Sequence, residues 1–283
     1  MLILVLIYSL LSYPGFQISN SYDYCFVRDS KIYVYSIPNK KEVLIPIDGN
    51  NPNLSPNGQE ITFVSSKGIC VYNLLTKKNR ILDLPGLNTQ MPVWSPNGKC
   101  IAYEVVYKGA NWGISIIDTS ENKVTDIIRP INSKYLGFFS PSWSSDSRKI
   151  LSNNMDSIFM FNSDGTIIAR FRIIGNPCSS SAKYLLNKDE KKIVFEFTTE
   201  DSNSRNFSGP VIGIYIYDIA SRISKRISPT NYYCTQPVIS GNRVYFTGEK
   251  PKSLSSDIYS MDFDGKNLKL EFTNARCFSA KIK

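Results

Sequence analysis

The chain has 283 residues, of which 42% are hydrophobic and 12% aromatic, so it can form a large packed core and its composition argues against wholesale disorder. Its 33 Lys and Arg residues outnumber its 24 Asp and Glu residues, but they are scattered in small groups beside expected turns, which argues against a clustered nucleic-acid interface. Histidine is absent, which excludes Ser-His-Asp and Cys-His catalysis, His-ligated zinc and a His general base.

The N-terminal segment is the first feature along the chain. An apolar run from Leu2 to Leu11 is followed by a Pro14-Gly15 breaker. A run this short suits an export signal better than a membrane-spanning helix, which needs about 20 apolar residues. We therefore expect an export signal in residues 1–20, a single domain in residues 21–283, a periplasmic or extracellular location, and no transmembrane helix after the signal. Because the run lacks a preceding Lys or Arg, an uncleaved membrane anchor and a misassigned start codon stay open as alternatives.

A turn signal recurs along the rest of the chain. The stretch WSPNGKCIAYE places Ser-Pro-Asn-Gly before an apolar run; LSPNGQEITF and WSSDSRKILS are close copies, and LNKDEKKIVF and ISGNRVYF are weaker ones. The copies begin at Leu54, Trp94, Trp143, Leu186 and Ile239, roughly 40 to 50 residues apart. This is the period of a four-stranded blade in a β-propeller. Because Trp94 and Trp143 occupy equivalent positions, we expect them in the core rather than in a ligand site.

Turn chemistry predicts two hairpins in each unit. Proline fixes the first central residue of a turn, and Asn-Gly or Asp-Ser accepts the left-handed backbone that reverses the chain. A second hairpin follows, with Asp-Gly or similar turns between runs of β-branched and aromatic residues, as in residues 157–174 and 257–272. Each unit is therefore predicted to contain four antiparallel strands. We assign Asp164 and Asp264 to chain reversal rather than to calcium binding, because their turns lack the further spaced acids of a calcium loop.

The first unit lacks its innermost strand. The strand candidates near Tyr24, in KIYVYSI and in EVLIPI supply only three strands, whereas a leftover strand candidate stands at the other end of the chain. An incomplete ring would leave unpaired strand edges. We predict that residues 276–282 become the innermost strand of the first blade and close a six-bladed ring.

These motifs resemble a known family. WSPNGKCIAYE, together with IYSMDFDGKNLKLEFT, resembles the TolB-type (PD40) repeat, and the resemblance covers essentially the whole chain after the expected signal. It implies an all-β fold, a six-bladed β-propeller of four-stranded antiparallel blades. The N-terminal α/β domain of TolB is not expected, because strand candidates begin near Tyr24. The WD repeat fits poorly, because its Gly-His dipeptide requires histidine. An oligogalacturonate lyase shares this kind of propeller but uses histidines, so its activity is not carried over.

The six cysteines form no Cys-x-x-Cys pair, which argues against a zinc site and against thioredoxin-like redox chemistry. We expect buried free thiols. In an oxidising compartment, two disulfides are alternatives. One joins Cys25 to Cys277, which the predicted closure brings into one blade. The other joins Cys178 to Cys234, which both precede an innermost strand in neighbouring blades.

We expect an exported binding module that docks a protein or peptide, in a cell-envelope complex as the family resemblance implies. We also expect the chain to be a monomer. The alternatives are a carbohydrate-active lyase or glycosidase using carboxylates in the central channel, and a purely structural surface protein. No phosphate-binding loop, nucleophile elbow or metal-binding motif is present in the sequence. We therefore expect no catalytic residues, no metal and no cofactor, and we do not expect nucleic acid as a partner.

Strand directions predict which face of the disc binds. In an antiparallel blade, the second-to-third-strand connections and the blade-to-blade connections fall on one face, here called the loop face, and the other turns fall on the turn face. Every long connection lies on the loop face, where recognition residues usually occur. We expect the binding side chains there, with the alternative that several only cover the blade cores. The candidates are Trp112, Tyr135, Phe138, Arg205, Phe207, Tyr232 and Tyr233.

Overall fold

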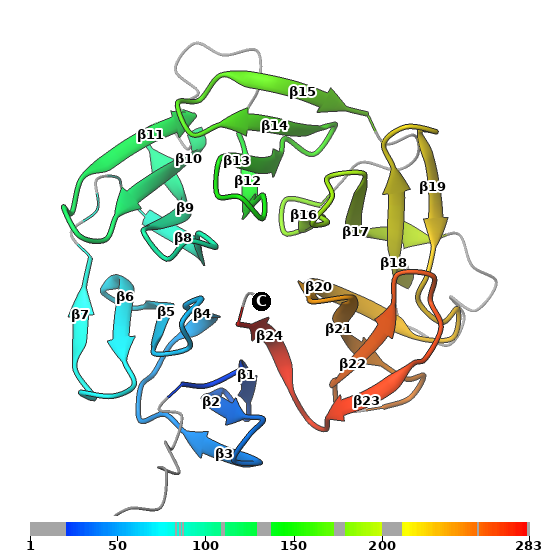
Figure 1. The fold of residues 1–283 in the computed structure, drawn as a ribbon, viewed down its shortest axis with the longest axis horizontal. Helices are drawn as coiled ribbons and strands as arrows, with labels where there is room; N and C mark the ends of the chain where they lie inside the picture. Colours follow the sequence, from blue (N-terminus) through cyan, green and yellow to red (C-terminus); the bar gives the residue numbers. More distant parts are fainter. Residues whose placement is uncertain are drawn as a thin grey trace, which may run out of the picture.

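The protein is a ring of six four-stranded antiparallel sheets around a central axis (Figure 1). The computed structural model describes residues 21–82, 84, 86, 88–108, 111–128, 137–172, 179–199, 211–253 and 255–281. Every regular element within those ranges is a β-strand. The predicted six-bladed propeller is therefore confirmed.

The blades follow one another in chain order, and each is numbered here with its strands from innermost to outermost. Blade 1 contains β24 (Arg276–Ala280), β1 (Tyr24–Arg28), β2 (Lys31–Ser36) and β3 (Lys41–Leu44); blade 2 contains β4 (Asn50–Leu54), β5 (Glu60–Ser65), β6 (Gly68–Asn73) and β7 (Asn79–Ile81); blade 3 contains β8 (Asn88–Trp94), β9 (Cys100–Tyr107), β10 (Asn111–Asp118) and β11 (Val124–Ile128). Blade 4 contains β12 (Phe139–Trp143), β13 (Lys149–Asn153), β14 (Ile158–Asn162) and β15 (Ile167–Phe171); blade 5 contains β16 (Tyr184–Leu186), β17 (Lys192–Thr199), β18 (Val211–Asp218) and β19 (Ile223–Arg226); blade 6 contains β20 (Tyr233–Ser240), β21 (Arg243–Glu249), β22 (Asp257–Asp262) and β23 (Lys269–Phe272).

The recurring turn motif joins the first strand of a blade to the second. Ser55 Oγ donates to Asn57 Oδ1 (2.7 Å) and accepts the backbone N–H of Glu60 (2.9 Å). The turns that begin at Ser95 and Ser144 have the same pair of bonds. A small hydroxyl followed two residues later by Asn or Asp therefore satisfies turn groups that the sheet leaves unpaired.

The core fills the spaces between adjacent blades. One cluster joins Ile69 and Val71 of blade 2 to Trp94 and Tyr103 of blade 3, and comparable clusters join the other blades. Trp94 is 2% exposed, so its predicted core position is confirmed. Trp143 is half-buried and donates its indole N–H to the Val93 carbonyl of the preceding blade (3.1 Å).

The first and last strands of the described chain meet in blade 1. β24 pairs antiparallel with β1, so the predicted closure by the C-terminal strand is confirmed (Figure 1). Phe278 on β24 is 1% exposed, and its ring lies 4.9 Å from that of Tyr245 and 5.1 Å from that of Tyr24. The strand therefore adds both ladder bonds and buried aromatic area.

The remaining expectations concern the export signal, membrane-spanning helices and disulfides. The export signal expected in residues 1–20 lies outside the described residues and stays a prediction. In the described part of the chain there is no helix of the length and apolarity needed to cross a membrane. Cys25 and Cys277 lie near each other in one core cluster, and both are free thiols in the structure. Cys234 is also free, whereas Cys178 lies outside the described residues.

We predict that deleting residues 274–283 will lower the melting temperature markedly. The deletion removes the innermost strand of blade 1 and exposes the aromatic cluster around Phe278. Phe278→Ala alone should cost about 3–5 kcal/mol, whereas Leu270→Ala, at a side chain that is 52% exposed, should change the free energy of unfolding little. Thermal and urea unfolding followed by circular dichroism measure both, and an unchanged melt after the deletion would contradict the account of closure.

Candidate functional site: a pocket in the central channel

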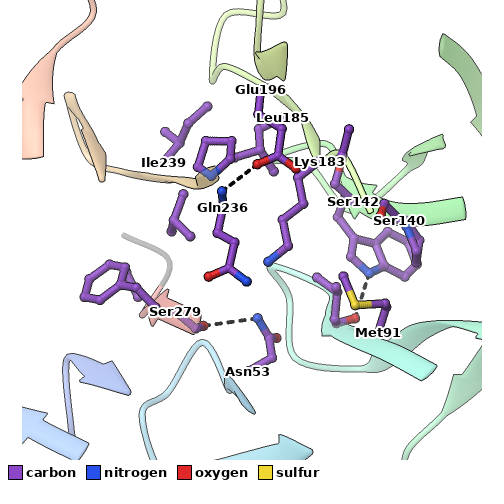
Figure 2. A pocket seen from close by; sticks show the side chains of 18 of the residues that line it. Asn53, Met91, Ser140, Ser142, Lys183, Leu185, Glu196, Gln236, Ile239 and Ser279 are labelled. Carbon is purple, nitrogen blue, oxygen red and sulfur yellow. Dashed lines mark hydrogen bonds between the residues drawn. The ribbon is translucent and has the colours of Figure 1, made fainter. Parts of the chain in front are cut away.

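A cavity of about 940 Å³ occupies the centre of the ring. Its walls come from the innermost strands of all six blades, and Figure 2 shows their side chains pointing inward. At the turn face it is bordered by Pro96, Asp146 and Lys188, and at the loop face by Thr198 and Tyr233. This channel pocket therefore runs along the axis from one face toward the other, and its volume is that of a typical ligand site.

A bulge recurs in the innermost strands. In five blades, one residue of the strand has a left-handed backbone, with φ between 50° and 56°, and the pairing with the second strand shifts at or beside it. In four of these blades, the next residue is proline. A bulge bends a strand and leaves its extra residue outside the ladder. The five residues, all of which line the channel pocket, are Asn51, Met91, Ser140, Gln236 and Cys277.

Hydrogen bonds across the blade boundaries satisfy many of the backbone polar groups of the innermost strands. At every boundary, a side chain of one blade bonds to the backbone of its neighbour, so the ring of bonds is continuous around the channel. In ring order, the bonds are Leu54 N to Ser279 Oγ (3.1 Å), Trp94 N to Asn53 Oδ1 (2.8 Å), Ser140 N to Glu104 Oε1 (2.6 Å), Ser142 Oγ to Tyr184 O, Gln236 N to Glu196 Oε2 (2.6 Å) and Cys277 N to Gln236 Oε1 (3.0 Å).

Two of these acceptors are buried carboxyl groups. Glu104 on β9 and Glu196 on β17 occupy equivalent positions, and each accepts the N–H of the bulge residue in the next blade. Burial raises the pKa of each carboxyl to about 7, and the N–H donor opposes this rise because it favours the charged form. Both groups therefore titrate close to neutral pH.

Blade 5 departs from the pattern at Lys183. This residue stands where the other blades have the bulge, but it lacks the left-handed backbone, and Tyr184 replaces the following proline. β16 pairs with β17 without a register shift. Figure 2 shows the Lys183 side chain extending into the pocket, with its amino end between the side chains of Gln236 and Asn53. Lys183 forms no ion pair with any residue that the structure describes.

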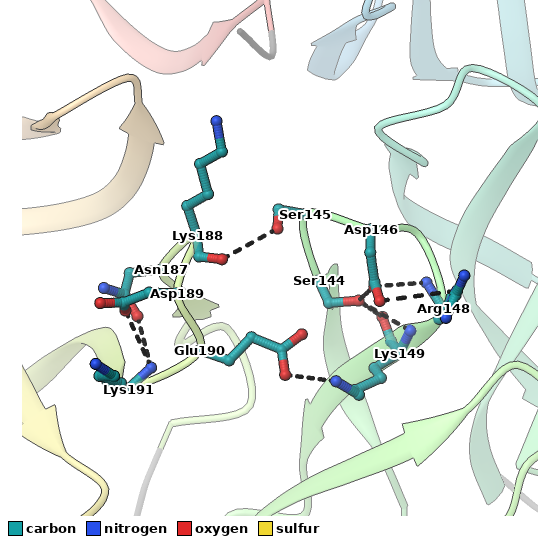
Figure 3. Close-up of polar contacts among 10 residues, drawn as sticks. All are labelled: Ser144, Ser145, Asp146, Arg148, Lys149, Asn187, Lys188, Asp189, Glu190 and Lys191. Atoms are coloured by element: carbon teal, nitrogen blue, oxygen red, sulfur yellow. Dashed lines mark hydrogen bonds and ion pairs between the residues drawn. The ribbon is translucent and has the colours of Figure 1, made fainter.

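The acidic residues that line the pocket are already engaged. Glu196 accepts the Gln236 N–H, and Asp146 accepts the Ser144 hydroxyl and the Arg148 N–H within its turn. Those turn bonds, above all the one from Ser144, lower the pKa of Asp146. Figure 3 shows this turn beside that of blade 5, where the Lys188 carbonyl accepts the Ser145 hydroxyl (3.5 Å). Among the residues that the structure describes, the free polar groups of the wall are therefore neutral or basic.

The binding residues expected on the loop face lie in different environments. Tyr233 is half-buried and lines the channel pocket. Trp112 is half-buried against Phe139, with 5.7 Å between the ring centroids, and Tyr232 is half-buried against Tyr259 (5.3 Å). Phe138 is 3% exposed and packs in the core between blades 3 and 4. For this residue the structure agrees with the alternative, in which the aromatic side chain only covers a blade core. The remaining three, Tyr135, Arg205 and Phe207, lie outside the described residues.

Sequence reasoning did not identify the channel pocket or Lys183. A usable signal was present, because proline stands two residues before the start of four of the five turn copies, in NPNL, MPVW, SPSW and QPVI. The equivalent residues in blade 5 are Lys183-Tyr184, which break the pattern. Comparing the repeats position by position would have singled out this lysine.

Comparisons with known proteins show the fold. No family model and no curated protein matches the chain. Among solved structures, TolB from Acinetobacter baumannii matches with a TM-score of 0.70 at 18% identity, covering 98% of this chain and 70% of the other. A structure assigned as TolB from Agrobacterium tumefaciens matches with a TM-score of 0.67 at 17% identity, covering 92% and 94%. An oligogalacturonate lyase in complex with manganese matches less well (TM-score 0.55, 13% identity, 88% and 76%). The expected resemblance to TolB is thus confirmed for the propeller.

The raised pKa of Glu196 predicts a pH dependence of stability. Its ordinary pKa is 4.5 and its folded-state pKa about 7, so between these values the folded state binds a proton that the unfolded chain has lost. The free energy of unfolding should therefore fall as pH rises through this window, by up to about 1.4 kcal/mol per pH unit for each such carboxyl. Glu104 should contribute in the same way, whereas turn carboxyls such as Asp146, whose pKa is lowered, act at lower pH.

Glu196→Gln keeps an oxygen for the Gln236 N–H but does not titrate, so it should reduce this slope by about half. Glu121→Gln, at an exposed residue, removes the same charge and should leave the slope unchanged. Urea unfolding between pH 4.5 and 7 measures the effect. An identical slope in Glu196→Gln and in the unsubstituted protein would show that this carboxyl is ionised throughout the window.

Proposed function

We propose that this chain is a protein- or peptide-binding propeller whose channel pocket receives a segment of the partner. The observation that carries the proposal is the pocket itself, which has about 940 Å³ of space between rigid innermost strands. Its wall is mixed, with Met91, Trp143 and Phe278 among the apolar residues and amides and hydroxyls between them. Apolar walls with a few fixed polar groups are typical of binding sites.

The carboxylates favour binding over hydrolysis. A glycosidase needs two carboxyl groups that face the substrate, one to protonate the leaving group and one to act as base or nucleophile. In the channel pocket, Asp146 stabilises its own turn and Glu196 holds the next blade. Neither is free to approach a ligand without breaking these bonds.

The loop face supplies further contact area in this proposal. Tyr233 begins β20 at that face and lines the pocket, while Trp112 and Tyr232 are half-buried in loop-face connections or at their edges. Half-buried aromatic side chains on a rigid scaffold are frequent hot spots of protein recognition. A partner segment in the channel would therefore continue across this face.

Filling the pocket tests the proposal. We predict that Met91→Trp, which places a larger side chain in the channel, will reduce retention of a degenerate pool of short synthetic peptides on the immobilised protein, because it occupies part of the space of about 940 Å³. Met91→Leu should retain the peptides as the unsubstituted protein does, since it nearly conserves volume. Mass spectrometry of the eluted peptides measures retention. If Met91→Trp retains the same peptides equally well, the channel is not the binding site.

The loop face is tested separately with longer peptides. Trp112→Ala and Tyr232→Ala should each weaken their binding by more than about 1 kcal/mol, as expected for hot-spot aromatics, without changing the fold. Lys99→Ala, at an exposed residue of the turn face, is the matched control. Titration calorimetry with a retained longer peptide measures the change, and weakening by Lys99→Ala alone would assign binding to the turn face.

A further inference from the structure

The channel pocket holds an amino group without an ionic partner. Lys183 extends from blade 5 into the cavity, and its amino end is seen between Gln236 and Asn53 in Figure 2. No residue that the structure describes forms an ion pair with it. Lys183 is half-buried in the cavity wall, and an anion beside a partly buried charge is attracted more strongly than in bulk water.

Two side-chain amides present donors to the same space. The backbone N–H of Cys277 donates to Gln236 Oε1 (3.0 Å), and that of Trp94 donates to Asn53 Oδ1 (2.8 Å). Because these partners are donors, they fix which end of each amide is oxygen, and the NH₂ ends are left for other contacts. Gln236 Nε2 has a weak acceptor in the Cys277 sulfur (3.6 Å), and Asn53 Nδ2 donates to Ser279 Oγ (3.1 Å). Each amide therefore keeps an N–H for a ligand.

The nearest buried carboxyl does not neutralise Lys183. Glu196 accepts the N–H of Gln236 (2.6 Å), and the backbone N–H of Lys183 also favours its charged form, but its carboxyl forms no ion pair with the Lys183 amino group. Burial raises the pKa of Glu196 to about 7, and the lysine charge opposes this rise only in part. Glu196 thus acts as a positioning residue, because it holds blade 6 so that Gln236 lies beside Lys183.

From this convergence of donors we infer that the channel pocket binds a carboxylate of its peptide ligand, with Lys183 as the charged contact and Gln236 and Asn53 as hydrogen-bond donors. The inference rests on the proposed function and specifies its ligand. The other described lysine of the wall, Lys188, borders the pocket at its turn-face end. Beside Gln236 and Asn53, one lysine with neutral donors therefore matches the single charge of a carboxylate. A phosphate dianion is usually bound by several cations or by a cluster of backbone N–H groups.

The surrounding wall defines the rest of the ligand. Met91, Leu185 and Ile239 are among the apolar residues that line the pocket with Lys183 (Figure 2). They suit apolar side chains next to the carboxylate. The bound segment is therefore acidic at one point and apolar beside it.

The test uses three pools of short synthetic peptides, degenerate at all other positions and otherwise neutral. One contains a fixed Asp or Glu and a C-terminal amide, the second replaces that residue by Asn or Gln, and the third has a free C-terminal carboxylate without acidic side chains. Each is passed over the immobilised protein, Lys183→Met and the control Lys191→Met, which removes the same charge from an exposed site. Circular dichroism melts confirm that the variants fold.

We expect the unsubstituted protein and Lys191→Met to retain one or both carboxylate pools. Lys183→Met should retain the same pool at least tenfold less, because it loses one charged hydrogen bond. Lys183→Arg should restore part of the retention, and the retained pool identifies a side-chain or a terminal carboxylate. Equal retention of charged and neutral pools, or undiminished retention by Lys183→Met, would overturn the inference and leave peptide binding in place. No retention of any pool by any of the proteins would overturn the proposed function as well.

Discussion

Side-chain to backbone hydrogen bonds between adjacent blades determine the geometry of the centre of this propeller. A bulge takes a backbone N–H out of its own ladder, and a buried N–H without an acceptor costs about 1–3 kcal/mol. Here the acceptor comes from the neighbouring blade, as when Glu104 accepts the N–H of Ser140 and Gln236 that of Cys277. At Ser140, Gln236 and Cys277, the contact that satisfies the bulge is therefore also a contact that joins the blades.

The same inter-blade hydrogen bonds hold both the channel wall and the closure of the ring. Asn53 donates to Ser279 of blade 1 and accepts from Trp94 of blade 3, so a single side chain links three consecutive blades. Glu196 similarly sets the position of Gln236. Asn53 and Gln236, which face the cavity, are thus held by the same bonds that hold the sheets, so these two side chains have fixed positions in the pocket.

The blade boundaries could be predicted from the sequence because turn chemistry repeats. Ser, Pro, Asn and Gly form the same bonds at each copy, so the residue types recur, and Leu54 and Trp94 do end innermost strands. The missing inner strand of the first blade followed from counting strands. The pocket did not follow, because the bulge residue is defined by its backbone and by an acceptor distant in sequence, and Met91 and Gln236 share no chemistry. Lys183 can be recognised as unusual only when its position is compared with the equivalent position in the other blades.

The central claim is that these inter-blade bonds hold the innermost strands for as long as the ring is folded. Native-state hydrogen exchange followed by NMR tests it most directly, at five described amides of the innermost strands whose acceptors are side chains of the adjacent blade. We predict that they exchange only through global unfolding, with opening free energies equal to that of the whole domain. Exchange of these amides through local opening, while second-strand amides such as that of Phe195 stay protected, would contradict the account. The five amides are those of Leu54, Trp94, Ser140, Gln236 and Cys277.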